Sequence, residues 1–139
     1  MRKLLAVLLA VVLAGLLAAC SNSADKKAAE DAVVDFHEML DASQFDAIYV
    51  GSAQDMKNAV KQEEFVTFLQ AVHKKLGKLR STVPQGWRIN YQTSGTFVAL
   101  GYETHFAEGD ATEEFTYRVT DNKATLVGYH VNSMALITK

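Results

Sequence analysis

The sequence has 139 residues, of which 49% are hydrophobic and 22% are charged, with 14 basic against 16 acidic side chains. This length fits a single domain, since domains typically contain roughly 100–200 residues. The formal net charge of −2 excludes a nucleic-acid binder that relies on concentrated positive charge. The single cysteine excludes both an internal disulfide and a four-cysteine zinc site.

Residues 1–19 have the pattern of a secretory signal peptide. Arg2 and Lys3 precede an uncharged apolar run over residues 4–19. The run is shorter than the roughly 20 residues that a membrane-spanning helix needs. It ends in the segment LAAC at residues 17–20, which resembles the lipobox of bacterial lipoproteins. In that motif the cysteine is lipidated and becomes the new N-terminus. An uncleaved anchor, in which Cys20 has no role, is the alternative.

The lipobox resemblance implies that Cys20 carries two or three acyl chains, and two chains hold a protein stably on a membrane. No aspartate follows Cys20 directly, which favours the periplasmic face of the outer membrane if the source is Gram-negative. Residues 20–28 then comprise the lipidated cysteine and a short polar tether. Residues 29–139 form the folded domain.

Helical periodicity dominates the first half of this domain. A first helix is predicted from an apolar stripe at spacings of three and four residues, formed by Ala29, Val33, Phe36 and Leu40. A short helix over residues 43–49 and a further turn from Ser52 to Val60 follow. The clearest helix has the stripe Phe65, Phe68, Leu69, Val72 and Leu76, and Gly77 is placed to be its left-handed C-cap.

After Leu79 the hydrophobic period changes to two. Four strands are predicted, over residues 87–92, 98–106, 115–119 and 127–131. The breaks between them are too short for a parallel crossover, so neighbouring strands are antiparallel. The sequence therefore predicts an α+β fold in which N-terminal helices pack on one face of a four-stranded meander.

Two short segments carry a family resemblance. LGKL at residues 76–79 and LVGYHVNS at residues 126–133 are similar to a family of small exported bacterial domains of unknown function. That family has the nuclear transport factor 2-like (cystatin-like) fold, and the resemblance covers residues 29–135. It implies a curved sheet that forms a cone with the helices, often with a pocket at the open end. Some members of the superfamily are isomerases or dehydratases and others are binding or dimerisation modules, so the fold does not decide the function.

Histidines and carboxylates offer few catalytic or metal-binding patterns. The four histidines, His37, His73, His105 and His130, form no i,i+4 pair, so no metal or other cofactor is predicted and surface or boundary positions are expected. Glu103 and His105 share one strand face, and with His130 they offer an acid–base pair to an isomerase- or dehydratase-like enzyme. Their face is the less apolar one, so we expect these side chains to be exposed to solvent.

The aromatic residues of the strands are expected to pack in the core; they are Trp87, Tyr91, Tyr102, Tyr117 and Tyr129. A pocket or partner surface is the alternative, and its candidate residues are Trp87, Tyr91, Tyr102, Glu103, His105, Tyr129 and His130.

Two charged segments are assigned to solvation. The basic stretch Lys74, Lys75, Lys78 and Arg80 compensates a helix dipole, with contact to anionic lipid as the alternative. The acidic hairpin Glu108, Asp110, Glu113 and Glu114 protects an exposed sheet edge from aggregation.

No phosphate-binding loop, serine nucleophile motif or catalytic thiol is present in the sequence. We therefore expect a non-enzymatic, membrane-anchored lipoprotein that binds a protein or a small molecule. A small-molecule enzyme and a structural homodimer are the alternatives.

Overall fold

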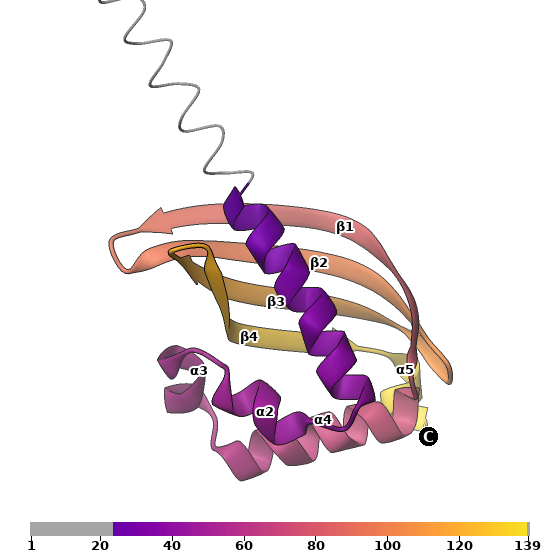
Figure 1. The fold of residues 1–139 in the computed structure, drawn as a ribbon. Helices are drawn as coiled ribbons and strands as arrows, with labels where there is room; N and C mark the ends of the chain where they lie inside the picture. Colours follow the sequence, from indigo (N-terminus) through magenta and orange to yellow (C-terminus); the bar gives the residue numbers. More distant parts are fainter. Residues whose placement is uncertain (1–23, 139) are drawn as a thin grey trace, which may run out of the picture.

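The helices of the described residues, except the short C-terminal one, precede the strands, as the change in hydrophobic period predicts. The computed structural model describes residues 24–138 (Figure 1). In this range a helix over residues 24–41 is followed by α2 (Phe45–Val50), α3 (Gln54–Ala59) and α4 (Gln62–Leu76). The strands are β1 (Leu79–Gln92), β2 (Gly95–Phe106), β3 (Gly109–Thr120) and β4 (Lys123–Asn132), and α5 (Met134–Thr138) follows them. The predicted α+β class is confirmed. The predicted signal peptide and Cys20 lie outside the described residues.

The N-terminal helix, residues 24–41, includes residues that the sequence analysis assigned to the tether. Residues 24–28, which were expected in the tether, are already helical. Lys26 and Lys27 form ion pairs, at 2.5 and 2.8 Å, with the carboxylates four residues later, and such pairs support a helix. The predicted apolar stripe is confirmed, because all four of its residues are buried: Ala29, Val33, Phe36 and Leu40.

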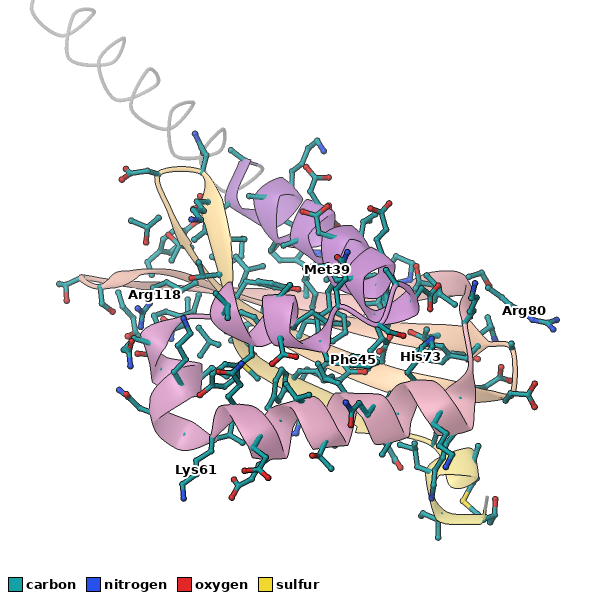
Figure 2. The ribbon with its side chains drawn as sticks, turned by 60° about the horizontal axis from the view of Figure 1, so that its bottom comes forward. Met39, Phe45, Lys61, His73, Arg80 and Arg118 are labelled. Carbon is teal, nitrogen blue, oxygen red and sulfur yellow. The ribbon has the colours of Figure 1, made fainter. Side chains whose placement is uncertain are left out.

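Helix α4 buries its predicted stripe except for Phe68, which is partly exposed. Between α2 and α4, the rings of Phe45 and His73 lie toward each other with centroids 6.0 Å apart (Figure 2). Gly77 ends α4 with a φ of 74°, as expected of its C-cap. A Cβ at this position would lie 3.2 Å from the Cβ of Ala107, so both the backbone angle and the space favour glycine.

The four strands form one antiparallel sheet in the order β1-β2-β3-β4, which confirms the predicted meander. Two-residue connections join the strands at residues 93–94, 107–108 and 121–122. Asp121 and Asn122 have φ angles of 50° and 59°, the positive values that a two-residue hairpin turn of type I′ requires.

The helices cover one face of the curved sheet, and the N-terminal helix crosses it obliquely (Figure 1). Phe115 lies at the centre of the core, with its ring centroid 5.1 Å from that of Phe36 and 5.0 Å from that of Tyr129. Tyr102 and Tyr117 also pack against it. The expected core packing is confirmed for Tyr102, Tyr117 and Tyr129, which are buried, and these rings fill much of the space between sheet and helices.

Strand β4 departs from the predicted alternation. Its register with β3 shifts between Thr116 and Tyr117. Leu126 and Tyr129, three residues apart, are both buried, whereas Val127 is only half-buried. A β-bulge inserts one extra residue into a strand and so changes which residues face the core.

Strand β1 is the least covered strand. Trp87 and Tyr91 pair with Leu100 and Thr96 of β2, and their rings lie on the face that the helices cover, yet they are 59% and 55% exposed. The N-terminal helix reaches this part of β1 through Lys26, whose Nζ lies 5.7 Å from the centroid of the Trp87 ring. The expected core packing of Trp87 and Tyr91 is therefore wrong, because the helices do not extend over this edge of the sheet.

Candidate functional site

A buried network of polar side chains lies between the N-terminal helix and the sheet. His37 Nε2 is 2.8 Å from Glu113 Oε2. The Thr104 hydroxyl donates to the same oxygen at 2.6 Å, and the Tyr129 hydroxyl donates to Glu113 Oε1 at 2.6 Å. An ionised carboxylate only accepts hydrogen bonds, so Glu113 is matched to donors from the N-terminal helix, β2 and β4.

Both members of the central pair are inside the protein. His37 is 3% exposed and Glu113 is 2% exposed. A buried charge is strongly unfavourable unless it is paired and hydrogen-bonded. The network meets this requirement, and it also ties the N-terminal helix to the middle of the sheet.

Both residues lie elsewhere than their residue types predict. We expected His37 at the surface or boundary and Glu113 on an exposed acidic hairpin. His37 lies four residues after the stripe residue Val33, and Glu113 shares the alternation of Phe115 and Tyr117. The positions of the two residues within apolar patterns were the available signal of burial. Their polar residue types led instead to the expectation of exposure.

Tyrosine hydroxyls complete the polar interior. Burial, with the neighbouring charge of Glu113, raises the pKa of Tyr129 well above its usual range, so its hydroxyl stays protonated and donates. Burial, together with the charge of Glu30, raises the pKa of Tyr102 to about 12. The Tyr117 hydroxyl donates to the backbone oxygen of Ala32 at 3.1 Å, which adds a second link between sheet and helix.

A pocket of about 230 Å³ lies between the N-terminal helix and the first two strands. His37 and Tyr102 line it, so it lies beside the buried network. Thr82 of β1 lines it too, and the other lining residues are three carboxylates and three apolar side chains: Glu30, Glu38, Asp41, Val33, Val34 and Leu79. The lining is therefore acidic and partly apolar. Larger depressions of about 330 and 440 Å³ lie elsewhere on the sheet and are more open.

The structure separates the predicted acid–base residues from this pocket. Glu103 and His105 lie on the opposite face of the sheet, as expected from its lower apolar content. Gln85 donates to Glu103 at 3.4 Å. His105 Nδ1 lies 2.8 Å from Asp110 Oδ1, and this hydrogen bond raises the pKa of His105 above its usual value. Glu103 and His105 thus each have another partner.

The remaining predicted site residues divide between the two faces. His130 is exposed and lines the 440 Å³ depression. Tyr102 and Tyr129 face the interior, at the pocket and at Glu113 respectively. Trp87 and Tyr91 lie together on the uncovered edge of β1. The structure therefore brings Tyr129 into the buried network and Tyr102 to the pocket beside it, and it leaves the other five residues outside both.

Within residues 24–138, no group of three or more histidine, cysteine or acidic side chains is arranged to hold a metal ion. No helix of this described part is both long and apolar enough to span a membrane. The basic stretch lies at the end of α4 and the start of β1, where Arg80 extends away from the body of the protein (Figure 2). Lys75 donates to the backbone oxygen of Leu136 at 2.6 Å, so this lysine holds α5 in place.

A family model described as a protein of unknown function, DUF4019, matches residues 32–129. The chain belongs to the DUF4019 family. This result confirms the predicted membership in a domain family of unknown function, and the helices before a curved antiparallel meander are the arrangement that the nuclear transport factor 2-like resemblance implies. Among solved structures, the chain is similar to an NTF2-like protein from Cytophaga hutchinsonii, with a TM-score of 0.44 and 14% identity over 76% of this chain and 98% of that chain. None of the curated proteins matches the chain significantly.

Proposed function

We propose that this DUF4019 protein is a membrane-anchored lipoprotein of the cell envelope whose folded domain binds a small ligand without transforming it. The LAAC segment ending in Cys20 supports the anchor. In a Gram-negative envelope the expected location is the periplasmic face of the outer membrane. The pocket beside His37 is the proposed binding site.

The observation that carries the binding function without catalysis is that the polar groups of the buried network are already hydrogen-bonded to one another. Both oxygens of Glu113 are engaged by side-chain donors, and His37 is 3% exposed. The pair therefore holds the wall of the pocket in place and offers little reactive surface to a bound molecule. Ligand pockets commonly combine an apolar lining with a few placed polar groups.

The lining also indicates a class of ligand. Glu38 and Asp41 give the pocket negative charge, whereas the charge of Glu30 is paired with that of Lys26. Val33, Val34 and Leu79 give the pocket apolar surface. Electrostatic complementarity favours a positively charged group. The proposed ligand is a small organic cation with a short apolar part.

The anchor is tested by labelling cells that express the chain with a fatty acid. Wild-type protein should take up the label and be shortened by the signal peptide. Cys20→Ser should lose the label and remain the longer precursor. Continued labelling of Cys20→Ser would contradict the proposed anchor.

The pocket is tested by NMR titration with octylamine, and with octanoate as a ligand of equal chain length and opposite charge. Octylamine should shift the signals of His37 and of the helix residues around it, and octanoate should not. Val34→Trp, at the exposed rim of the pocket, should abolish the shifts. Val50→Trp, at an exposed valine of α2, should preserve them. Equal shifts from the two ligands, or none from octylamine, would contradict the proposed ligand class.

An enzyme is the second candidate, because a histidine paired with a buried carboxylate lines a pocket. This geometry resembles the carboxylate-oriented histidine that serves as a general base in other enzymes. The role would fall to His37 and not to Glu103, His105 or His130. A molecule that copurifies with the protein distinguishes the two candidates. After incubation with the protein, a binding module leaves this molecule chemically unchanged, whereas an enzyme converts it.

A further inference from the structure

The exposed aromatic edge consists of Trp87 and Tyr91 on β1. The two side chains are four residues apart on one strand and point to the same face, about 13 Å apart along the strand. Each is more than half exposed. Large aromatic side chains dominate buried area in folded proteins, so two neighbouring exposed rings indicate a surface that contacts something else.

The position of the exposed aromatic edge relative to the N-terminus indicates what it contacts. Lys26 lies over the Trp87 ring, at 5.7 Å from its centroid, and Lys26 is six residues after Cys20. From Cys20 to residue 24 there are four Cα–Cα steps of 3.80 Å, so this segment spans at most about 15 Å. If Cys20 is embedded in a bilayer through its lipid, the start of the N-terminal helix and the Trp87 ring beside it are held close to the bilayer surface.

The basic stretch is at the other end of the same helix. Asp41 of the N-terminal helix accepts a hydrogen bond from the backbone of Leu79 at 3.2 Å, next to Lys78 and Arg80. Residues 24 and 41 are separated by about 25 Å along the helix, at 1.5 Å per residue. Figure 1 shows the start of this helix beside β1 and its end beside the end of α4. The tether therefore favours contact of the aromatic edge with lipid over contact of the basic stretch.

The charges around Trp87 are balanced. Lys26, which lies over the Trp87 ring, is paired with Glu30, and the neighbouring Lys27 is paired with Asp31. Tryptophan and tyrosine are enriched at membrane interfaces, where their rings lie at the level of the lipid headgroups. A contact of this kind does not require anionic lipid.

We infer that the exposed aromatic edge, Trp87 and Tyr91, inserts into the headgroup region of the bilayer that holds the lipid anchor and so fixes the orientation of the domain on the membrane. This inference rests on the proposed lipidation of Cys20. It assigns the surface to lipid and not to a second copy of the chain or to a protein partner.

Trp87 is the only tryptophan of the chain, so its fluorescence reports on this contact directly. The mature lipoprotein is reconstituted into vesicles of zwitterionic phosphatidylcholine with or without bromine on the upper acyl chain. We expect the emission of Trp87 to shift to shorter wavelength on the vesicles and to be quenched by brominated lipid, equally at low and high salt.

The matched control moves the tryptophan to α5, at the end of the domain that contacts Lys75. In the double variant Trp87→Phe/Ile137→Trp, the new side chain replaces an exposed isoleucine, and its emission should not be quenched. Equal quenching of both proteins would overturn the inference, as would unquenched Trp87 in protein that sediments with the vesicles. Loss of quenching at high salt would show electrostatic contact instead of aromatic insertion, and would also overturn it.

Two further outcomes have separate meanings. A blue shift of Trp87 that depends on protein concentration in detergent, without vesicles, would assign the edge to a second copy of the chain and overturn the inference. Protein that does not sediment with vesicles at all would refute the proposed anchor, and the orientation that depends on it would then be refuted as well.

Discussion

A histidine–carboxylate pair lies at each face of the sheet. At the inner face His37 of the N-terminal helix pairs with Glu113 of β3, and at the outer face His105 of β2 pairs with Asp110 of β3. The nitrogen–oxygen distance is 2.8 Å in both pairs. The side chains of the inner pair are 3% and 0% exposed, whereas those of the outer pair are 35% and 69% exposed. Equal nitrogen–oxygen distances thus occur with very different burial.

Burial decides what each pair contributes. Water and salt screen an exposed pair, which then adds little to the free energy of unfolding. In the interior, removal of one partner leaves the other buried without compensation, which is strongly destabilising. The two pairs have the same distance, so the surroundings of a contact determine its contribution to stability.

The largest expected effect follows from removing the carboxylate of the inner pair. Glu113→Ala leaves the donors on His37, Thr104 and Tyr129 without their acceptor. We expect the free energy of unfolding to fall by about 3–5 kcal/mol, as measured by urea denaturation. Glu114→Ala is the matched control, because Glu114 is the next residue of β3 and is exposed; a surface change of this kind stays within about 0.5 kcal/mol. Similar losses for the two variants would mean that the burial of Glu113 does not determine its contribution to stability.

A smaller effect is expected from a single donor to the inner carboxylate. Tyr129→Phe removes one hydrogen bond to Glu113 and keeps the ring in the core. Hydrogen bonds to charged groups contribute about 1.5–3 kcal/mol, so the free energy of unfolding should fall by that amount. Tyr91→Phe, on the exposed aromatic edge, should change it by no more than about 0.5 kcal/mol. A Tyr129→Phe protein as stable as the wild type would mean that this hydrogen bond adds nothing.

The main measurable effect of the outer pair should be on the pKa of His105. Because the hydrogen bond to Asp110 raises the pKa of His105, NMR should show the ring titrating above the usual value of about 6.5. Asp110→Asn should lower this pKa toward that value. A raised pKa adds stability below the pKa of the unfolded chain, and this contribution disappears as the pH rises through the folded pKa. The solvent exposure of His105 should keep that contribution within the error of a denaturation curve. An unchanged His105 pKa in Asp110→Asn would show that another group sets it.

Much of the fold could be predicted because apolar periodicity reports burial directly. The stripes of the N-terminal helix and α4, and the alternation of β2 and β3, all point to the helix-covered face. The site was harder to predict, because the analysis assigned His37 and Glu113 by their polarity although their positions followed the apolar pattern. The exposure of Trp87 could not be predicted, because alternation gives the face of a strand but not how far the helices extend across it. The β4 bulge was missed for a similar reason, since it depends on pairing with β3.

The most direct test of the inner pair is a double-mutant cycle on His37 and Glu113, with leucine at each position and the free energy of unfolding as the readout. Either single variant leaves a polar partner buried, whereas the double variant removes both members of the pair. We expect the double variant to be less destabilised than the two single losses added together, by about 2–3 kcal/mol. A parallel cycle on His105 and Asp110 should show no coupling above experimental error. Additive losses at His37 and Glu113 would contradict the account, because they would mean that the buried pair does not act as a unit.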